Sequence, residues 1–312
     1  MDIKNVVVAG GGVLGSQIAF QSAYKGFNVK VWLRSEGSIE RAKPKFERWK
    51  NVYLQTLEAM KTNPAAYARG LADSPELSDE QIEALKAQVE KAAESIVLTT
   101  SYDEAFGDAN LVIEAIAEEP KQKIELYTEM QKHLPERTIV CTNSSTMLPS
   151  QFAEYTGRPA KYLALHFANE IWKNNTAEVM GHPGTDPAAY EQVAEFAGKI
   201  GMIPLRLKKE QPGYILNSML VPFLTAAESL LANGVADPET IDKTWMLATG
   251  APVGPFRILD IVGLVTAYNI VVMNPQASDP ETTPGKIAAT LKKYIDEGKT
   301  GVNAGEGFYK YK

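Results

Sequence analysis

The sequence of 312 residues predicts an α/β domain built on a parallel sheet, followed by a smaller all-helical domain. Three observations support this fold class. Short β-rich runs alternate with amphipathic helical stretches over about the first two thirds of the chain. A glycine-rich turn joins the first run to a helix, and from about Glu210 onward only helical patterns follow. We therefore expect domains of residues 1–208 and 209–312.

Six runs rich in β-branched residues are expected to form the sheet. In chain order they are NVVVAG, NVKVWL, SIVLTT, NLVIEAI, TIVCTN and YLALHF. Near-continuous apolar runs of this length are typical of strands that are buried on both faces. Since helical segments separate most of these runs, a sheet of parallel strands joined by crossovers is predicted.

A long insert between the second and third runs predicts a projecting helical hairpin. Its first half carries apolar residues at helical spacing, namely Phe46, Trp49, Val52, Tyr53 and Leu57. Its second half opens with Ser78 and Gln81, which are spaced as a capping box. Apolar residues then follow at helical spacing, namely Ile82, Leu85, Val89 and Ala93.

The C-terminal domain is expected to contain helices only. QPGYILNSMLVPFLTAAESLLANG predicts a nearly all-round apolar helix that begins after Pro212-Gly213 and ends at Gly234. Further helical segments are PETIDKTWMLATG, ILDIVGLVTAYNIVVM and PGKIAATLKKYIDEG. Because so few helices cannot bury this much apolar surface alone, we also expect this domain to form a homodimer interface.

Composition excludes several classes of function. The net charge of -6 argues against nucleic acid as the main partner. The single cysteine, Cys141, excludes an intrachain disulfide and a cysteine-based zinc site, and its apolar surroundings predict a buried structural thiol. No metal site is expected. No apolar run reaches the roughly 18 residues of a membrane span, and MDIKNVVVAGGG lacks a signal-peptide pattern, so a cytoplasmic protein is expected.

The first β-rich run leads into a G-x-G-x-x-G motif formed by Gly10, Gly12 and Gly15. The helix that follows opens with Val13 and Leu14, so the motif lies in a full strand–turn–helix context. This context predicts a Rossmann-like dinucleotide site. Gly10 would permit the tight turn, Gly12 would let backbone approach a pyrophosphate, and Gly15 would allow close helix–strand packing. A merely structural glycine turn is the alternative.

The end of the second run carries Leu33, Arg34 and Ser35 where dinucleotide-binding folds usually supply Asp or Glu. A carboxylate there accepts hydrogen bonds from the ribose of NAD and repels the 2′-phosphate of NADP. Leu33 can do neither, whereas the Arg34 guanidinium matches a phosphate bidentately and Ser35 adds a hydroxyl donor. NADP(H) is therefore favoured. Alternatively, Arg34 points to solvent or stacks on the adenine, which would leave mixed specificity and allow NAD(H).

Polar residues that suit acid–base chemistry follow the later runs. Asn143, Ser144 and Ser145 follow TIVC, while His166 ends YLALHF and Glu178 comes twelve residues later. In an open α/β sheet, chemistry gathers at the carboxyl ends of the strands. Histidine titrates in the range that proton transfer to an alcohol oxygen needs, and a nearby carboxylate can orient its ring.

The two other histidines are expected to have no part in this chemistry. His133 is expected at a helix C-terminus, where it would be favourable to the dipole and otherwise idle, and His182 in a turn. His166 alone ends an apolar strand beside a polar loop. A satisfied structural histidine remains the alternative for His166.

The whole chain resembles the 3-hydroxyacyl-CoA dehydrogenase family. The resemblance is carried by VLGSQIAFQ, LALHFAN, NNTAEVMG, GAPVGPFRILDIVGLVTAYN and GEGFYKY. It implies a nicotinamide-dependent oxidoreductase that interconverts a 3-keto and a 3-hydroxy group. The HFFNP-type motif, here HFANE, implies His166 as the catalytic histidine, and the VEV-type motif, here AEV, implies Glu178 as its partner. The NTSS-type loop and GYILNS imply Ser145 and Asn217 as further catalytic residues.

The same resemblance extends to the cofactor and the substrate. IEAIAEEPKQK implies Glu118 and Lys123 near the nicotinamide ribose, and Asn143 is a further cofactor contact that the family pattern implies. Within the family, the resemblance is strongest to bacterial members that reduce diketo compounds. It therefore favours a short β-keto or β,δ-diketo acid or ester as the substrate.

Departures from the family pattern bear on the substrate. Ala168 and Glu170 replace the second aromatic residue and the proline of HFFNP, which enlarges the site and adds a carboxylate that suits a CoA thioester poorly. A cluster of basic residues on the hairpin could grip a CoA phosphate but fits a solvated helix face better; it comprises Lys43, Lys45, Arg48 and Lys50. A 3-hydroxyacyl-CoA is the second candidate substrate. A non-enzymatic role like that of the family's lens crystallins is a remote third alternative.

Overall fold

The computed structural model describes residues 2–311 and divides the chain into two compact units. The first unit runs to Ile215, and the second begins at Leu216. The boundary expected between residues 208 and 209 lies a few residues earlier, where the last strand of the first unit has just ended. No helix among the described residues has both the length and the apolar character that crossing a membrane requires.

The first unit contains an eight-stranded sheet with the order β3-β2-β1-β4-β5-β6-β7-β8. The six predicted strands are confirmed as parallel neighbours: β1 (Asn5–Ala9), β2 (Asn28–Trp32), β3 (Val97–Thr99), β4 (Leu111–Glu114), β5 (Ile139–Thr142) and β6 (Tyr162–Phe167). The chain passes outward from β1 in one direction to β3 and in the other to β6. The carboxyl ends of β1, β4, β5 and β6 therefore lie along one edge of the sheet.

Two strands were not predicted, and they correct the expectation of a wholly parallel sheet. β7 (Thr176–Met180) runs antiparallel to β6, and β8 (Ile203–Arg206) runs parallel to β7. β8 is an edge strand that is only partly buried, so its short sequence carries no long apolar run. The β6–β7 register makes His166 and Glu178 direct partners across the two strands.

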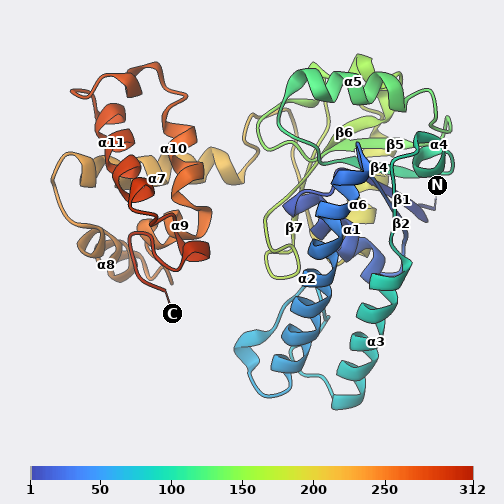
Figure 1. Ribbon diagram of the computed structural model, residues 1–312, viewed down its shortest axis with the longest axis horizontal. Coiled ribbons are helices and arrows are strands. Elements are labelled where there is room, and N and C mark those ends of the chain that lie inside the picture. The colour runs from blue at the N-terminus through green and yellow to red at the C-terminus, as the bar shows by residue number, and fades with distance from the viewer. Residues whose placement is uncertain (1, 312) are drawn as a thin grey trace. The chain divides into compact units, whose positions relative to one another are not determined.

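Helices cover both faces of this sheet, as Figure 1 shows. Val6 and Val8 of β1 belong to a core cluster with residues of α1 (Val13–Tyr24), α2 (Glu36–Met60), α3 (Asp79–Ser95) and α6 (Pro187–Lys199). Val7 and Ala9 belong to a second cluster with residues of α4 (Tyr102–Phe106) and α5 (Pro120–Met130). Alternate residues of one strand thus serve opposite cores, as the two-residue period of a strand requires.

The predicted hairpin is formed by α2 and α3, which run side by side away from the sheet (Figure 1). The capping box is confirmed: the Ser78 amide donates to Gln81 Oε1 at 2.8 Å, and the Gln81 amide donates to Ser78 Oγ at 3.2 Å. The apolar side chains Trp49, Tyr53 and Leu57 of α2 are buried. Short 3-10 turns complete the first unit: η1 (Pro64–Ala66), η2 (Pro149–Gln151), η3 (Ala153–Thr156) and η4 (Pro159–Lys161).

The second unit is helical, as predicted. One segment that was expected to be a single helix is divided into two helices. The helices are α7 (Leu216–Ala232), α8 (Pro238–Thr249), α9 (Pro255–Val262), α10 (Leu264–Val271) and α11 (Thr283–Asp296), with 3-10 turns η5 (Pro275–Ser278) and η6 (Val302–Ala304). Residues 258–273 do not form one helix, because Gly263 has a φ of +93° and the Leu264 amide donates to Thr300 O. The expected start of α7 directly after Gly213 is also displaced, to Leu216.

Glu228 on α7 is a buried acid in this helical unit. Its side chain is 5% exposed, and its Oε1 has no hydrogen-bond partner among residues 2–311. Burial raises the pKa of Glu228 from 4.5 to about 7, because a carboxylate away from water is disfavoured. Between these two pH values the folded protein holds a proton that the unfolded chain has released. Stability is therefore lost as the pH rises from about 4.5 to 7.

We expect Glu228→Gln to remove this pH dependence. The stability of the variant relative to the unmodified protein should increase by about 3 kcal/mol between pH 4 and pH 8, since each pH unit of pKa shift corresponds to about 1.4 kcal/mol. Urea unfolding followed at both pH values measures the change. The exposed Glu281, replaced in the same way, is the matched control and should show no such increase. A stability difference that is the same at both pH values would contradict the prediction.

Candidate active site

The glycine turn has the shape that a dinucleotide pyrophosphate needs. Gly10 has a φ of +118°, and a Cβ there would lie 2.5 Å from Ala115 O. A Cβ on Gly15 would lie 2.3 Å from Gly10 O, so α1 packs directly against the turn. A Cβ on Gly12, by contrast, would meet nothing within 4 Å. Tight packing at Gly10 and Gly15 and open space at Gly12 fit the approach of a ligand to the start of α1.

The next two residues complete the start of α1. Gly12 is the residue before the helix, and no side chain caps it. Val13 is exposed, whereas Leu14 packs against the first core cluster. The first amides of α1 therefore lie at the turn without a side-chain acceptor, which is the arrangement that favours an anion.

A cavity of about 490 Å³ opens beside this turn. Glycine backbone, aromatic rings and basic side chains line it, including Gly12, Trp32, Leu33, Arg34, Arg41, Lys45 and Tyr102. The rings of Trp32 and Tyr102 pack together with their centroids 4.8 Å apart. The cavity has the size of a small-molecule or cofactor site, and it is continuous with the glycine turn.

The three residues at the end of β2 have different surroundings. Leu33 is buried and would contact a Cβ placed on Gly11. Arg34 is exposed, lines the cavity and donates from Nη1 to Gln122 Oε1 at 3.4 Å. Ser35 caps α2: its Oγ accepts from the Ser38 amide at 3.3 Å and lies 3.0 Å from Ser38 Oγ. Of these three residues, Leu33 and Arg34 line the cavity.

Lys45 departs from its expected place on a solvated helix face. Its Nζ donates to Gly11 O at 2.7 Å, and its side chain lines the cavity. The other hairpin cations behave as expected for a surface. Lys43 pairs with Glu40, and Lys50 pairs with Glu90. One basic residue of this cluster therefore belongs to the glycine turn, because α2 passes beside it.

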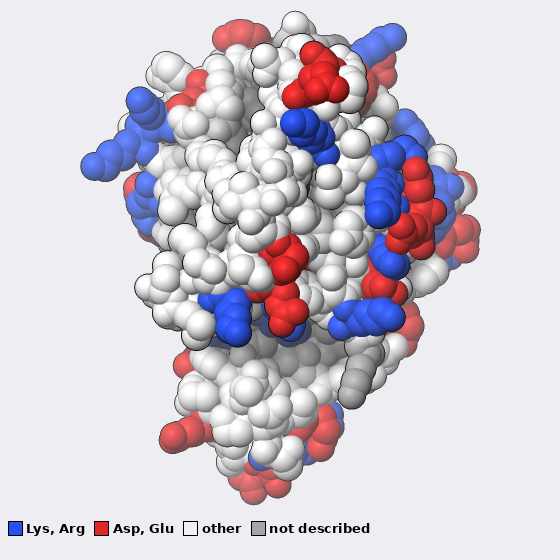
Figure 2. Space-filling model, turned by 90° about the vertical axis from the view of Figure 1, so that its left-hand side faces the viewer, with Lys and Arg blue, Asp and Glu red and all other residues white. Residues whose placement is uncertain are grey.

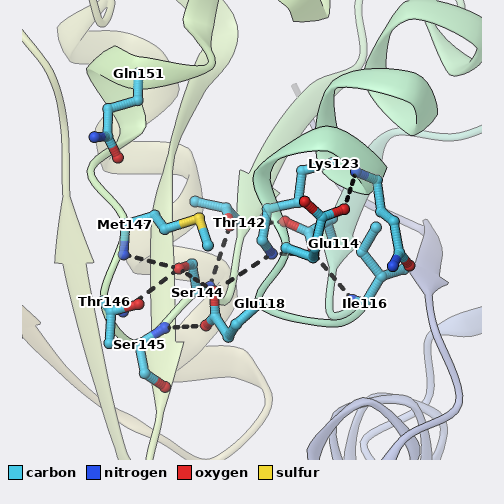
Figure 3. A network of polar contacts seen from close by, with 12 residues as sticks. Glu114, Ile116, Glu118, Lys123, Thr142, Ser144, Ser145, Thr146, Met147 and Gln151 are labelled. Atoms are coloured by element: carbon cyan, nitrogen blue, oxygen red, sulfur yellow. Dashed lines mark hydrogen bonds and ion pairs between the residues drawn. The ribbon is translucent and has the colours of Figure 1, made fainter. Parts of the chain in front are cut away.

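Glu118 holds the loop that follows β5. Its Oε2 accepts from Ser144 Oγ at 2.7 Å, and its Oε1 accepts from the Ser145 amide at 2.6 Å. Ser144 Oγ in turn accepts from the Met147 amide at 3.0 Å. Figure 3 shows these contacts converging on the loop from the chain that follows β4. The carboxylate of Glu118 thereby fixes the backbone that presents the Ser145 side chain.

Glu114 is a site residue that the sequence reasoning missed. This fully buried carboxylate ends β4 and accepts hydrogen bonds from Lys123 Nζ (2.7 Å), the Ile116 amide (2.9 Å), Tyr127 OH (2.7 Å) and Thr142 Oγ1 (2.8 Å). Figure 3 shows Lys123 on the same carboxylate. The signal was present, since Glu114 is an acid inside the apolar run NLVIEAI.

Lys123 is buried with Glu114, and its Nζ also lies 3.8 Å from Glu118 Oε2. The two carboxylates and this ammonium group join the ends of β4 and β5 to the serine loop. Asn143 adds a further link, because its amide donates to Glu114 O at 2.8 Å and its Oδ1 accepts from the Phe167 amide at 3.2 Å. The network therefore connects three neighbouring strand ends.

His166 lies at the centre of a chain of polar contacts. Its Nδ1 lies 2.9 Å from Glu178 Oε2, and its Nε2 lies 3.2 Å from Ser145 Oγ. Since a carboxylate can only accept, Nδ1 carries a hydrogen and Nε2 faces the serine hydroxyl. Glu178 Oε1 also accepts from the Ile215 amide at 2.9 Å. Both side chains are nearly buried, so the imidazole is held in one orientation.

Tyr214 is a second residue that the sequence reasoning missed. Its ring stacks on His166 with the centroids 4.4 Å apart and an interplanar angle of 11°. Its hydroxyl donates to Ser144 O at 2.7 Å. Burial, with smaller contributions from nearby carboxylates, raises the pKa of Tyr214 above its ordinary value, so the phenol stays a donor. The sequence predicts a helix for GYILNS, whereas Tyr214 lies in the turn before α7, and a helix gives no reason to expect this stacking.

Asn217 lies in the second unit, on the first turn of α7. The other predicted catalytic residues, Ser145, His166 and Glu178, belong to the first unit and are joined directly. The part that Asn217 plays therefore stays a prediction.

The remaining histidines and the cysteine have structural surroundings. His133 is not idle: its Nδ1 lies 2.6 Å from Asp103 Oδ1, and this contact is the main cause that raises the pKa of His133 above 6.5. His182 lies in a turn, as predicted, with its Nε2 2.9 Å from Pro159 O. Cys141 is buried on β5, and burial raises the pKa of its thiol.

Comparison with known proteins shows which family both units of the chain match. Residues 5–211 match the family model for the NAD binding domain of 3-hydroxyacyl-CoA dehydrogenase, and residues 213–311 match the model for its C-terminal domain. Human mitochondrial hydroxyacyl-coenzyme A dehydrogenase is 32% identical over 99% of this chain and 92% of its own. A probable 3-hydroxybutyryl-CoA dehydrogenase of Bacillus subtilis is 28% identical over 100% of this chain and 98% of its own.

Solved structures are also similar over their whole lengths, and two of them serve as examples. A diketoreductase that acts on dicarbonyl compounds is 48% identical and has a TM-score of 0.84, with 100% of both chains covered. FadB2 of M. tuberculosis is 26% identical and has a TM-score of 0.79, again with 100% of both chains covered. The fold and the matches define an oxidoreductase that uses a nicotinamide dinucleotide to interconvert hydroxyl and keto groups. The chain belongs to the 3-hydroxyacyl-CoA dehydrogenase family.

Proposed function

We propose that this protein is a carbonyl reductase that reduces the 3-keto group of a short β-keto or β,δ-diketo acid or ester with NADP(H). The observation that carries the proposal is the connected set Ser145–His166–Glu178, with contacts of 3.2 Å and 2.9 Å at the ends of neighbouring strands. A histidine oriented by a carboxylate and facing a hydroxyl can hold and move the proton that carbonyl reduction requires.

In reduction, the Ser145 hydroxyl and the Asn217 amide would hold the substrate carbonyl oxygen. The bound nicotinamide supplies the hydride. His166 would deliver a proton from Nε2 to the oxygen as negative charge develops there, and Glu178 would stabilise the imidazolium through Nδ1–H. Oxidation of the hydroxy compound would use the same groups in the opposite direction. Glu118 and Lys123 would lie near the ribose next to the nicotinamide, and Asn143 would be a further cofactor contact.

Two residues after β6 support a small substrate without CoA. Ala168 leaves space where the family pattern has an aromatic ring, and Glu170 adds an exposed carboxylate whose Oε2 lies 3.7 Å from Lys173 Nζ. A carboxylate at this loop disfavours a polyanionic thioester. The similar diketoreductase acts on dicarbonyl compounds, which agrees with this substrate class. A 3-hydroxyacyl-CoA is the second candidate, because the curated relatives are dehydrogenases of that class.

The preference for NADP(H) rests on the end of β2. Leu33 occupies the position of the usual acid, so nothing there repels a 2′-phosphate. Arg34 lines the cavity beside the glycine turn and could pair with that phosphate.

We also propose that the second unit forms the interface of a homodimer. Most of the large apolar side chains that are exposed belong to it, among them Met219, Val235, Leu247, Ile261 and Met273. In the view of Figure 2, broad uncharged areas lie between scattered charged side chains. Exposed apolar surface of this extent is typical of subunit contacts. A sedimentation mass of one chain would exclude the dimer.

The proposed use of a nicotinamide dinucleotide also bears on location. Since nicotinamide dinucleotides are intracellular cofactors, we propose a cytoplasmic location.

A substrate and cofactor matrix tests the proposed reaction. The protein is mixed with acetoacetyl-CoA or a free 3,5-diketo ester, each with NADPH or NADH, and the loss of the reduced cofactor is followed by absorbance. We expect the highest kcat/KM with the free diketo ester and NADPH. A higher value with acetoacetyl-CoA would favour the thioester dehydrogenase, and a strong preference for NADH would contradict the NADP(H) assignment. If no mixture shows loss of the reduced cofactor, the non-enzymatic alternative would be favoured.

A further inference from the structure

Arg41, seven residues beyond Arg34, lines the same cavity. Its Nη2 donates to Ser38 Oγ at 2.9 Å, and both residues line the cavity with Arg34. A Cβ placed on Gly37 would lie 3.5 Å from Arg41 Nη1. The guanidinium therefore folds back over the first turn of α2, next to Gly37 and Ser38, although the residue is exposed.

The position of Arg41 favours an anion. The N-terminus of a helix carries a partial positive charge, so a cation held beside it is disfavoured unless a negative group neutralises both. The carboxylate in that turn, Glu36, accepts a hydrogen bond from Thr100 Oγ1 at 3.2 Å. No carboxylate of residues 2–311 forms an ion pair with Arg41. Among the described residues, three basic side chains and one acid, Glu125, line the cavity.

The hydroxyl groups of Ser35 and Ser38 have different roles at the start of α2. Ser35 Oγ is the N-cap of α2 and is not part of the cavity lining. Ser38 Oγ lies between Ser35 Oγ at 3.0 Å and Arg41 Nη2 at 2.9 Å, and it lines the cavity. A hydroxyl that already accepts from a guanidinium can donate its own hydrogen to an anion oxygen. Ser38 is thus better placed than Ser35 to contact a ligand.

We propose that Arg41 and Ser38, acting with Arg34, bind a phosphomonoester dianion on the adenosine ribose of the cofactor. This inference rests on the proposed NADP(H) preference and deepens it, by moving the main determinant from Ser35 to the Arg41–Ser38 pair. The two guanidinium groups supply forked donors that match phosphate oxygens, the hydroxyl supplies a third donor, and the start of α2 adds its dipole. Lys45, held on Gly11 O, adds positive charge nearer the glycine turn.

Binding of two small probes to the full-length protein tests the inference without turnover. Calorimetry compares 2′,5′-ADP, which carries the ribose phosphate, with 5′-AMP, which lacks it. We expect the unmodified protein to bind 2′,5′-ADP more tightly. Arg41→Met should weaken the binding of 2′,5′-ADP at least about tenfold, since it removes charge-assisted hydrogen bonds to the ribose phosphate, and should leave the binding of 5′-AMP unchanged. Ser38→Ala should act in the same direction with a smaller effect.

Matched variants separate this inference from the proposed function. Lys43→Met removes a cation of the same helix that pairs with Glu40 and does not line the cavity, so neither probe should be affected. If only Arg34→Met weakens 2′,5′-ADP, the NADP(H) preference stands and the Arg41–Ser38 site is overturned. Equal losses for both probes in Arg41→Met would overturn it as well. If the unmodified protein binds both probes equally, the inference and the NADP(H) preference both fail, whereas the carbonyl reductase proposal remains.

Discussion

His166→Gln should lower kcat by about two to four orders of magnitude, the range that a positioned general acid or base contributes. Glutamine keeps a polar group near Ser145 but has no proton that it can exchange near neutral pH. It also cannot use Glu178 to stabilise a cationic form. Steady-state reduction of the preferred keto substrate measures kcat, and fluorescence titration of the reduced cofactor measures binding. Cofactor affinity should stay nearly unchanged, because the glycine turn and its cavity are lined by other residues.

His182→Gln is the matched control for this experiment. His182 lies in a turn and contacts Pro159 O, away from the polar chain of His166, so kcat should remain within about twofold of the original value. Turnover that survives in His166→Gln would refute the assignment of the proton donor. A parallel loss in His182→Gln would show that the effect is structural instead.

Lys123→Met should destabilise the protein by about 3–5 kcal/mol, because it leaves the fully buried carboxylate of Glu114 without a cation. Tyr127, Thr142 and the Ile116 amide would still donate to Glu114. Hydrogen bonds alone do not replace the neutralising charge inside a sheet. Urea unfolding at pH 7 measures the loss, and a change below about 1 kcal/mol would contradict the central place of this pair.

A double variant shows whether the uncompensated charge is the cause. Glu114→Gln combined with Lys123→Met removes both charges, and we expect it to be more stable than Lys123→Met alone. Lys43→Met, which breaks the exposed pair with Glu40, should cost less than about 1 kcal/mol. If the double variant is as unstable as the single one, lost packing rather than buried charge explains the effect.

Features set by local sequence could be predicted. The six strands that end at β6 come from β-rich runs, and the structure confirms each of them as a strand. β4, β5 and β6 are fully buried, as such runs predict, whereas β3 at the sheet edge is only partly buried. The capping box of Ser78 and Gln81 depends on a spacing of three residues and is also confirmed. For the glycine turn, the three motif positions have the packing that their spacing suggested.

Features that depend on residues far away in the sequence could not be predicted. β7 has the acid Glu178 at its centre, and β8 is partly exposed at the sheet edge, so neither forms a distinctive apolar run. The Glu114 carboxylate is stable in a buried strand only because four hydrogen-bond donors surround it. They come from β5, from α5 and from the loop that follows β4. Tyr214 stacks on a histidine 48 residues earlier in the chain, and Lys45 reaches the glycine turn only because α2 passes beside it.

The pairing of β6 with β7 makes the acid–base dyad inseparable from the alignment of two strands. His166 and Glu178 are opposite partners, so a slip of one position would send one of the two side chains to the other face of the sheet. Residues 168–175 connect the two strands. A change in the length of this connection preserves the contact between His166 and Glu178 only if the alignment of β6 with β7 is kept. The ladder of backbone hydrogen bonds between β6 and β7 therefore keeps the imidazole and its carboxylate opposite each other.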